Sequence, residues 1–284
     1  MVASASLHMG IKLTNDAFHF PLHQLIHIGL GLVLGVFVAA TPMRVWERWG
    51  GVLFISGLLL LIIVLIPGVG IEVNGSRRWI GLGGIRIQVS EVTKFFSVIY
   101  MAGYVTRHQQ TVQESAFGLL NPLILFSVAC VLLLLEPDFG SAVVILMIAM
   151  GVMFLAGAKI WQFVILLGSV ALLMGLLVAF EPYRLRRVTS FMDPWADPLG
   201  SGFQLTHALI SFGRGEWGGV GLGSGVQKLF YLPEAHTDFI FSVIAEELGL
   251  LGVVTVIVLF AVFVWRIFTI GAAASECLGN AFRK

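Results

Sequence analysis

Seven apolar runs divide this chain, and each is close to the ~20 residues that an α-helix needs to cross about 30 Å of hydrocarbon. They lie at roughly 21–41, 50–70, 89–106, 117–135, 139–157, 161–180 and 239–268. Lipid offers no partners for free backbone groups, and these runs are too long for the strands of a barrel. Because only 12% of the residues are charged, too few to cover a water-facing surface, we expect an all-α polytopic membrane protein.

The composition also limits the partners and cofactors that the sequence predicts. The formal net charge is +1 and no basic tail is present, so no nucleic-acid partner is expected. The two cysteines, Cys130 inside an apolar run and Cys277 near the end, have no metal-ligand spacing and predict no disulfide. The first 20 residues are polar and mixed, so we expect no cleavable signal peptide.

One long segment, residues 181–238, breaks the apolar pattern and gathers many of the ionisable side chains in one place. A membrane protein that does this is expected to build a site for chemistry or recognition at the bilayer surface. Within the segment, residues 213–225 hold seven glycines. They lack the lysine and the preceding strand of a P-loop, so we expect a tightly folded or mobile loop there, not a nucleotide site.

The charges of the short loops do not orient the chain in the membrane. Each side has four basic residues, namely Arg44, Arg48, Arg107 and Lys159 on one side and Lys12, Arg77, Arg78 and Arg86 on the other. The positive-inside rule, which applies to short loops, therefore favours neither orientation. If residues 181–238 are extracytoplasmic, their arginines need an anionic ligand to explain them.

Residues 70–80 place two arginines and an indole after an expected Asn74-Gly75 turn. The planar guanidinium groups of Arg77 and Arg78 suit phosphate, because each can make paired charge-assisted hydrogen bonds. The alternative is an interfacial anchor, with Trp79 in the aromatic belt and the arginines on lipid phosphates. On these residues alone the two interpretations have equal weight.

Two residue pairs have helical spacing near the ends of apolar runs. Glu91 and Lys94, three residues apart, can pair on one helix face, either as a functional pair within the membrane or as an interfacial pair that completes the helix start. His23 and His27, four residues apart, can ligate zinc, but no third ligand is near them in the sequence. Interfacial histidines are the favoured interpretation, and no metal site is predicted.

Two aspartates precede apolar helices. Asp138, in Glu136-Pro137-Asp138, is placed to cap the helix that is expected from Phe139, and a cap is its favoured role. Asp238 precedes the last apolar run; the helix dipole favours its charged form, and partial burial opposes it. On position alone, a helix N-cap and a catalytic base remain equal alternatives for Asp238.

Several longer strings carry a resemblance to a known family: VNGSRRWI (73–80), SEVTKF (90–95), EPDFGS (136–141) and the stretches at 183–216 and 219–249. Over nearly its whole length the chain resembles the SEDS family of shape, elongation, division and sporulation proteins. DPWADP (193–198) and YLPEAHTDFIF (231–241) are closer to its cell-division branch than to its elongation branch.

The resemblance implies a peptidoglycan glycosyltransferase that polymerises lipid II during septal cell-wall synthesis. It further implies a multi-pass protein of the bacterial inner membrane at the division septum, with residues 181–238 in the periplasm. The catalytic aspartate of the family lies in its HTDF motif, which here contains Asp238. Its implied role is to accept the proton of the acceptor sugar's 4-hydroxyl as that oxygen attacks the donor.

The resemblance, together with charge and location, also gives a set of candidate binding residues. The substrate-binding candidates are Arg77, Arg78, Trp79, Arg184, Arg186, Arg187, Gln204, Lys228, Glu234 and His236. For the five arginines, diphosphate binding is our own hypothesis. The resemblance assigns Glu91 and Lys94 to a structural ion pair. No cofactor is evident, and the need for a divalent cation is left open.

The expected partners are the lipid II substrate, a class B penicillin-binding transpeptidase, other divisome membrane proteins and membrane lipids. The family has ten spans and this chain supplies seven. We therefore expect a single SEDS-type membrane domain over residues 1–284 that is truncated at both ends. Two further functions remain as alternatives: a lipid II flippase, and a non-catalytic divisome scaffold that recruits a penicillin-binding protein.

Overall fold

In a computed structural model, the chain forms a set of helices with one small sheet. The structure describes residues 2–73, 76–82, 85–157, 159–180, 182–229 and 237–281. The elements in chain order are α1 (Val2–Thr14), α2 (His19–Ala40), α3 (Met43–Leu65), β1 (Ile71–Val73), β2 (Ser76–Leu82), β3 (Ile85–Gln88), α4 (Val89–Arg107), α5 (Gln109–Glu114), α6 (Ala116–Leu135), α7 (Phe139–Leu155), α8 (Ile160–Ala179), α9 (Pro182–Met192), η1 (Pro194–Ala196), α10 (Phe203–Gly215) and α11 (Ile240–Ala281).

Each predicted apolar run coincides with a helix, namely α2, α3, α4, α6, α7, α8 and α11. Within the described residues, three helical segments are long and apolar enough to cross a membrane: His19–Ala40, Met43–Leu65 and Ile240–Ala273. The all-α polytopic membrane fold is therefore confirmed. The crossing of the membrane by the other four helices stays a prediction, as does the single domain over residues 1–284.

The chain divides into two compact units. One, which we call the central unit, comprises Gly35–Leu177, and the other, the terminal unit, comprises Met1–Leu34 and Val178–Lys284. Each unit has its own internal packing.

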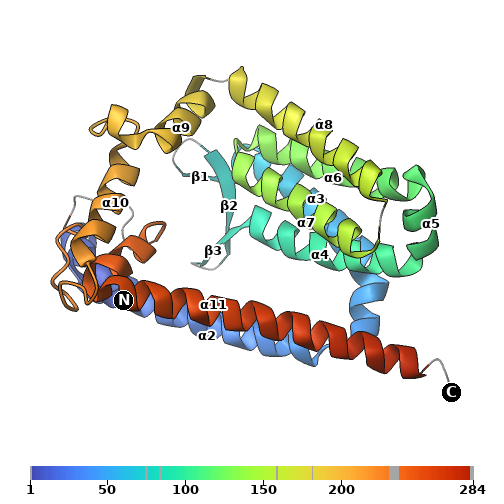
Figure 1. Ribbon diagram of the computed structural model, residues 1–284, viewed down its shortest axis with the longest axis horizontal. Coiled ribbons are helices and arrows are strands. Elements are labelled where there is room, and N and C mark those ends of the chain that lie inside the picture. Colours follow the sequence, from blue (N-terminus) through green and yellow to red (C-terminus); the bar gives the residue numbers. More distant parts are fainter. Residues whose placement is uncertain are drawn as a thin grey trace. The chain divides into compact units, whose positions relative to one another are not determined.

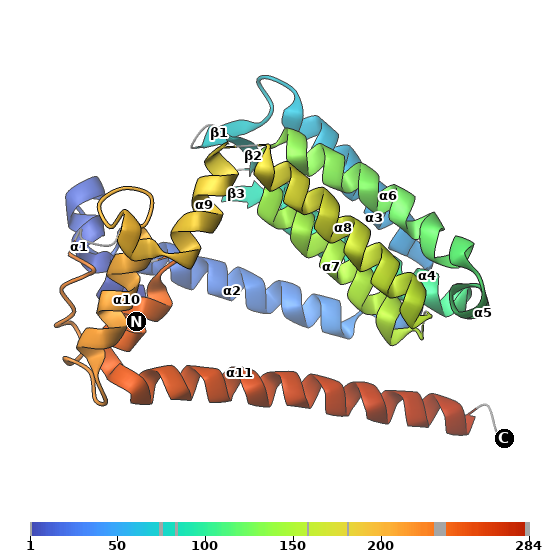
Figure 2. The ribbon, with the colours of Figure 1, turned by 45° about the horizontal axis from the view of Figure 1, so that its top comes forward.

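The central unit is a bundle in which α3, α4, α6 and α7 lie side by side (Figure 1, Figure 2). Its core contains one cluster of buried apolar side chains from α3, α4, α5, α6 and α7. Phe54 is fully buried within it, and the centroid of its ring lies 5.0 Å from those of Tyr100 and Phe126. Aromatic contacts of this kind and the surrounding aliphatic side chains hold the helices together.

A small antiparallel sheet, with strand order β1-β2-β3, connects α3 to α4. The sequence analysis predicts only a turn here. The expected Asn74-Gly75 turn lies outside the described residues, but β1 and β2 pair on either side of it, with Val73 opposite Ser76. Two-residue connections of this composition favour hairpins because they tolerate positive φ angles. The short strands are hard to recognise in a sequence dominated by apolar helices.

In the terminal unit, much of the predicted large loop is helical. Residues 181–238 contain α9, η1 and α10. Helix α10 packs against α11, and the rings of Phe212 and Phe241 meet edge to face with their centroids 5.6 Å apart. The face of α10 that is buried carries mainly small residues, among them Ala208 and Ser211, which allow close contact between helices. This packing places a folded polar segment before α11.

Candidate functional site

Asp238, the candidate catalytic residue, lies in the terminal unit. It is exposed within the turn formed by residues 237–239, two residues before Ile240 begins α11. The backbone N–H groups of Ser242 and Val243 donate to the carbonyl of Phe239, which continues this turn into the helix. Asp238 therefore presents a carboxylate to solvent at the N-terminus of a helix, where negative charge is favourable.

Lys228, ten residues before Asp238, belongs to a buried polar network. The ammonium group of Lys228 lies 2.5 Å from Glu247 Oε1, and both side chains are almost inaccessible to solvent. Ser4, on α1, lies within hydrogen-bond distance of both, with its hydroxyl 2.8 Å from Glu247 Oε1 and 2.9 Å from Lys228 Nζ. Lys228, a predicted substrate-binding residue, is therefore engaged inside the protein with only 3% of its surface exposed.

A second carboxylate of α11 holds the same segment through its backbone. Glu246 is fully buried, and its two side-chain oxygens accept hydrogen bonds from the backbone N–H groups of Val226 and Gln227. The guanidinium group of Arg214 lies 3.7 Å from the same carboxylate. Charge-assisted bonds of this kind are stronger than those between neutral groups, so the chain around residue 227 is fixed to α11.

Helix α11 is interrupted at Gly249, where the glycine-rich segment crosses it. Gly249 has a φ of 62° and a ψ of −158°. Beyond the break, the N–H of Leu250 donates to the carbonyl of Glu216 and that of Leu251 to the carbonyl of Trp217. The glycine-rich loop is therefore tightly folded here, which is one of the two forms that the sequence analysis allows.

Of the other candidates in residues 181–238, Arg186 on α9 and Gln204 on α10 are exposed. The side chains of Arg184 and Arg187 lie outside the described part of the chain, as do residues Glu234 and His236. The structure thus brings Lys228 into contact with α11 and leaves Arg186 and Gln204 open to solvent.

Asp197 closes the turn between η1 and α10. Its carboxylate accepts hydrogen bonds from the backbone N–H groups of Gly200 and Ser201 and from the Ser201 hydroxyl. The bonds from Ser201 are the main reason why the pKa of Asp197 is below its ordinary value, and the charge of Arg186 adds to the effect. Asp197 therefore has a role in folding this turn.

In the central unit, neighbouring arginines of β2 make different contacts. Arg77 is about two-fifths exposed, and its Nε lies 3.2 Å from the carboxylate of Glu72 on the paired strand β1. Trp79 is partly exposed and lies opposite Ile71. The pairing of β1 with β2 is irregular between Ile71 and Glu72, so Arg78 is an extra residue between the paired residues Arg77 and Trp79.

Arg78 joins the sheet to the turn between α6 and α7. Its Nη2 donates to the carbonyl of Pro137 at 2.7 Å, and its Nε lies within reach of the Ser76 hydroxyl and the Glu136 carbonyl. Its Nη1 is 3.9 Å from Asp138 Oδ1. Arg78 is therefore largely occupied by contacts within the protein.

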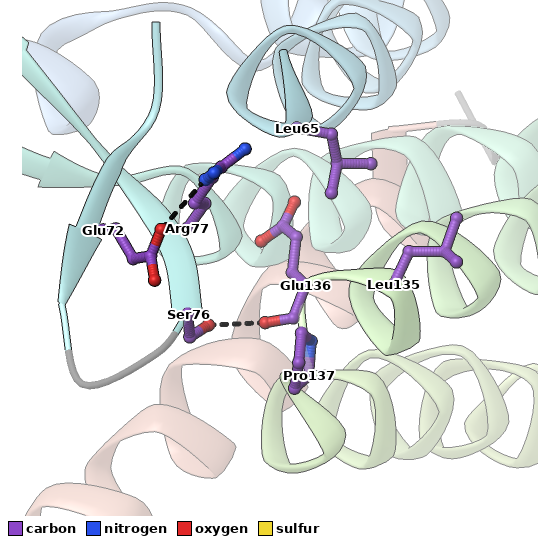
Figure 3. A pocket seen from close by; sticks show the side chains of 7 residues that line it. All are labelled: Leu65, Glu72, Ser76, Arg77, Leu135, Glu136 and Pro137. Atoms are coloured by element: carbon purple, nitrogen blue, oxygen red, sulfur yellow. Dashed lines mark hydrogen bonds and ion pairs between the residues drawn. The ribbon is translucent and has the colours of Figure 1, made fainter. Parts of the chain in front are cut away.

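A cavity of about 340 Å³ lies beside these contacts. It is lined by Leu65, Glu72, Ser76, Arg77, Leu135, Glu136 and Pro137, and the carboxylate of Glu136 points toward the space between Arg77 and Leu65 (Figure 3). Glu136 is only 1% exposed, and among the described residues neither of its side-chain oxygens has a hydrogen-bond partner. Burial above all, together with the charge of Asp138, raises its pKa to about 8, although the charge of Arg78 opposes the shift.

The remaining candidates of the sequence analysis have simple local contacts. Asp138 Oδ1 accepts the backbone N–H of Ser141 at 3.2 Å, so its predicted role as the N-cap of α7 is confirmed. Lys94 Nζ lies 2.6 Å from Glu91 Oε1, and the carboxylate of this pair is exposed.

His23 and His27 are exposed, and each places Nδ1 near the carbonyl four residues earlier in α2. Among the described residues, no group of three or more histidine, cysteine, aspartate or glutamate side chains is arranged to hold a metal ion.

Comparison with known protein families gives a match over nearly the whole chain. The family described as "Cell cycle protein", which comprises FtsW, RodA and SpoVE, matches residues 1–282. The chain belongs to the FtsW, RodA and SpoVE family.

Two curated relatives in this family are named "Probable peptidoglycan glycosyltransferase FtsW". The relative from Methylomonas methanica is 59% identical over 99% of this chain and 72% of its own length. The relative from Methylococcus capsulatus is 60% identical over 99% of this chain and 71% of its own length.

Solved structures show the same family fold. A chain from a study of polymerisation and crosslinking by a peptidoglycan synthase complex has a TM-score of 0.73 and 29% identity, and the match covers 96% of this chain and 75% of that one. The rod shape determining protein RodA of Thermus thermophilus has a TM-score of 0.61 and 25% identity, with 96% and 72% covered.

The sequence analysis did not assign a role to several residues that organise this member of the FtsW, RodA and SpoVE family. Glu246 and Glu247 were visible as charges within an apolar run, and that unusual placement was the available signal. Ser4 gave no signal, because its contact with Glu247 joins residues 243 positions apart. The burial of Glu136, whose carboxylate has no hydrogen-bond partner in the part of the chain that the structure describes, also depends on contacts that no local pattern encodes.

Proposed function

We propose that this chain is a peptidoglycan glycosyltransferase that polymerises lipid II into glycan strands during septal wall synthesis. The observation that carries the proposal is identity of 59% and 60%, over 99% of the chain, to two relatives with that enzyme name. The likeness to a chain of a peptidoglycan synthase complex supports the same function.

In the proposed step, Asp238 is the general base. The 4-hydroxyl oxygen of the acceptor sugar attacks the anomeric carbon of the donor, and a glycosidic C–O bond forms. The bond between that carbon and the lipid diphosphate breaks, and the diphosphate leaves with the electron pair. The hydroxyl proton passes to the Asp238 carboxylate. A positioned base typically contributes about 10²–10⁴-fold to such a step. The exposure of Asp238 at a helix N-terminus supports this role.

We propose that the arginines act on the diphosphate in two ways. Arg186 is exposed and the Arg77 side chain is about two-fifths exposed, so both suit direct contact with phosphate oxygens. The same role is proposed for Arg184 and Arg187. Arg78 already donates to the turn between α6 and α7, so its proposed role is to hold the sheet that carries Arg77. Trp79, Gln204, Glu234 and His236 remain proposed contacts for the rest of the substrate.

The proposed setting is the inner membrane at the division septum, with residues 181–238 in the periplasm. The lipid-linked donor and the growing strand are then available on the outer face, beside Asp238. A class B penicillin-binding transpeptidase is the proposed partner, since glycan strands require crosslinking after polymerisation. Contacts with other divisome membrane proteins belong to the same proposal.

The test uses the purified protein with its transpeptidase partner and fluorescent lipid II. Glycan polymer formed by the wild type and by Asp193→Asn, but not by Asp238→Asn, supports the proposal. Asp193 is the matched control because it is an exposed aspartate of the same segment, and among the described residues its side chain makes no capping hydrogen bond to η1. Movement of lipid II between leaflets that is indifferent to Asp238 contradicts the proposal in favour of a flippase. Binding of the partner without polymer or flipping contradicts it in favour of a scaffold.

A further inference from the structure

We propose that Lys228, Glu247 and Ser4 are positioning residues that hold Asp238 in place before the first turn of α11. This inference rests on the proposed role of Asp238 as the base. It assigns to Lys228 a different role from the substrate contact that its charge suggests, because its ammonium group is buried and contacts Glu247 and Ser4 inside the protein.

The first reason is that the three buried side chains all contact one another. The Lys228 ammonium group contacts Glu247 Oε1 at 2.5 Å and the Ser4 hydroxyl at 2.9 Å. The same hydroxyl lies 2.8 Å and 2.9 Å from the two oxygens of Glu247. A buried ion pair with additional hydrogen bonds has one favoured geometry, whereas an exposed pair has many.

The second reason is the position of Asp238 between the two charges. Lys228 precedes Asp238 by ten residues and Glu247 follows it by nine. The ion pair therefore closes a loop in the chain with Asp238 near its middle. Closing a loop restricts the positions available to a residue near its middle, such as Asp238. Glu246 reinforces the closure, because it accepts the backbone N–H groups of Val226 and Gln227.

The third reason is that stability alone does not explain the pair. Desolvation of two buried charges offsets much of their attraction, and apolar residues of similar volume often replace such pairs without loss of stability. Registry is the better-attested use of a buried ion pair. Here the ion pair fixes the position of Lys228 relative to the first turns of α11. Ser4 attaches α1 to the same pair.

The test compares the double variant Lys228→Met/Glu247→Met with the wild type, measuring unfolding, hydrogen exchange and polymerisation of lipid II by the complex with the transpeptidase. We expect a fully folded protein, faster exchange of the backbone amides in residues 237–243, and a roughly 10- to 100-fold lower kcat with little change in KM. The matched control is Lys159→Met/Glu114→Met, which makes the same substitutions at exposed residues of the central unit and is expected to behave like the wild type.

A conservative variant separates positioning from general damage. Lys228→Arg retains a cation with hydrogen-bond donors, so it is expected to recover most of the kcat that Lys228→Met loses. A folded double variant with unchanged kcat and unchanged exchange in residues 237–243 overturns the inference, and so does equal loss of kcat in Lys228→Arg and Lys228→Met.

Two further results complete the test. If the double variant fails to fold, Ser4→Ala decides, since unchanged kcat in that variant overturns the inference and a several-fold fall supports it. Polymerisation by the wild type and its loss in Asp238→Asn are measured in parallel. An inactive wild type or an active Asp238→Asn then shows that the proposed function is wrong. This result does not depend on the activity of the Lys228 and Glu247 variants.

Discussion

Arg78 donates a hydrogen bond from Nη2 to the carbonyl of Pro137 at 2.7 Å and thereby joins strand β2 to the turn between α6 and α7. This turn contains two acidic residues whose hydrogen bonding differs. Asp138 caps α7, whereas Glu136 is buried without a hydrogen-bond partner among the described residues. The junction between sheet and bundle therefore combines a strong polar link with a carboxyl group that burial keeps protonated near neutral pH.

The first prediction concerns the pH dependence of stability. The pKa of Glu136 rises from its ordinary value of 4.5 to about 8 in the folded protein, so the folded state binds more protons than the unfolded state between these values. The free energy of unfolding should therefore fall as the pH rises from about 4.5 to 8, by at most about 1.4 kcal/mol per pH unit from this group.

Glu136→Gln should remove this part of the slope, and unfolding in detergent at several pH values measures it. Glu114→Gln, at an exposed position of α5, serves as the control and should keep the wild-type slope. Parallel stability curves for the wild type and Glu136→Gln would contradict the assignment.

The second prediction concerns the two arginines of β2. Arg78→Ala removes the hydrogen bond to the carbonyl of Pro137 and the weaker of two to the carbonyl of Glu136, to which the Ser76 hydroxyl still donates. It should lower the free energy of unfolding by about 1–3 kcal/mol. Arg77→Ala removes an exposed pair with Glu72 and should cost less than about 1 kcal/mol. Chemical unfolding of both variants measures the difference. A larger loss of unfolding free energy in Arg77→Ala than in Arg78→Ala would contradict the contacts assigned to the two arginines.

The third prediction concerns the break in α11. At Gly249 the φ of 62° is unfavourable for other residues, and an added Cβ would overlap the backbone of Gly219 and Gly215. Gly249→Ala should therefore destabilise the protein by more than the ~1–2 kcal/mol of a left-handed backbone alone.

Gly213→Ala is the matched control, because an added Cβ meets no atom within 4 Å and the residue lies within α10. It should be neutral or stabilising by up to about 1 kcal/mol. Thermal unfolding of the two variants measures the difference. Similar melting temperatures would argue against close contact between Gly249 and the glycine-rich loop.

The fourth prediction concerns orientation. Leu199→Cys, at a highly exposed position in residues 181–238, should react with a membrane-impermeant thiol reagent in cells whose outer membrane alone is permeable. Gln110→Cys, exposed in α5 on the opposite predicted face, should react only after the inner membrane is opened. The reverse pattern would place the Asp238 segment in the cytoplasm and remove its proposed access to the substrate.

The helices could be predicted because an apolar run of about 20 residues has few alternatives in lipid. The cap at Asp138 was also predictable, since its signal is local. The sheet was not, because β1 and β3 are only three and four residues long and lie between two strongly apolar helices. Within residues 181–238, the concentration of polar residues concealed the helices α9 and α10.

The candidate site was predictable to a different extent. Asp238 could be singled out from its position before an apolar helix and from the family resemblance. The pairing of Lys228 with Glu247 could not, because both are common surface residues and only tertiary packing buries them. The same holds for Ser4, whose partner lies at the other end of the chain.

The most direct test of the account is the kcat for lipid II polymerisation by Asp238→Asn, measured in complex with the transpeptidase and compared with Asp193→Asn. Asparagine has nearly the same shape but cannot accept the proton, so kcat should fall by about 10²–10⁴-fold while Asp193→Asn remains close to the wild type. A kcat for Asp238→Asn within a few-fold of the wild type, in a folded protein, would contradict the central claim.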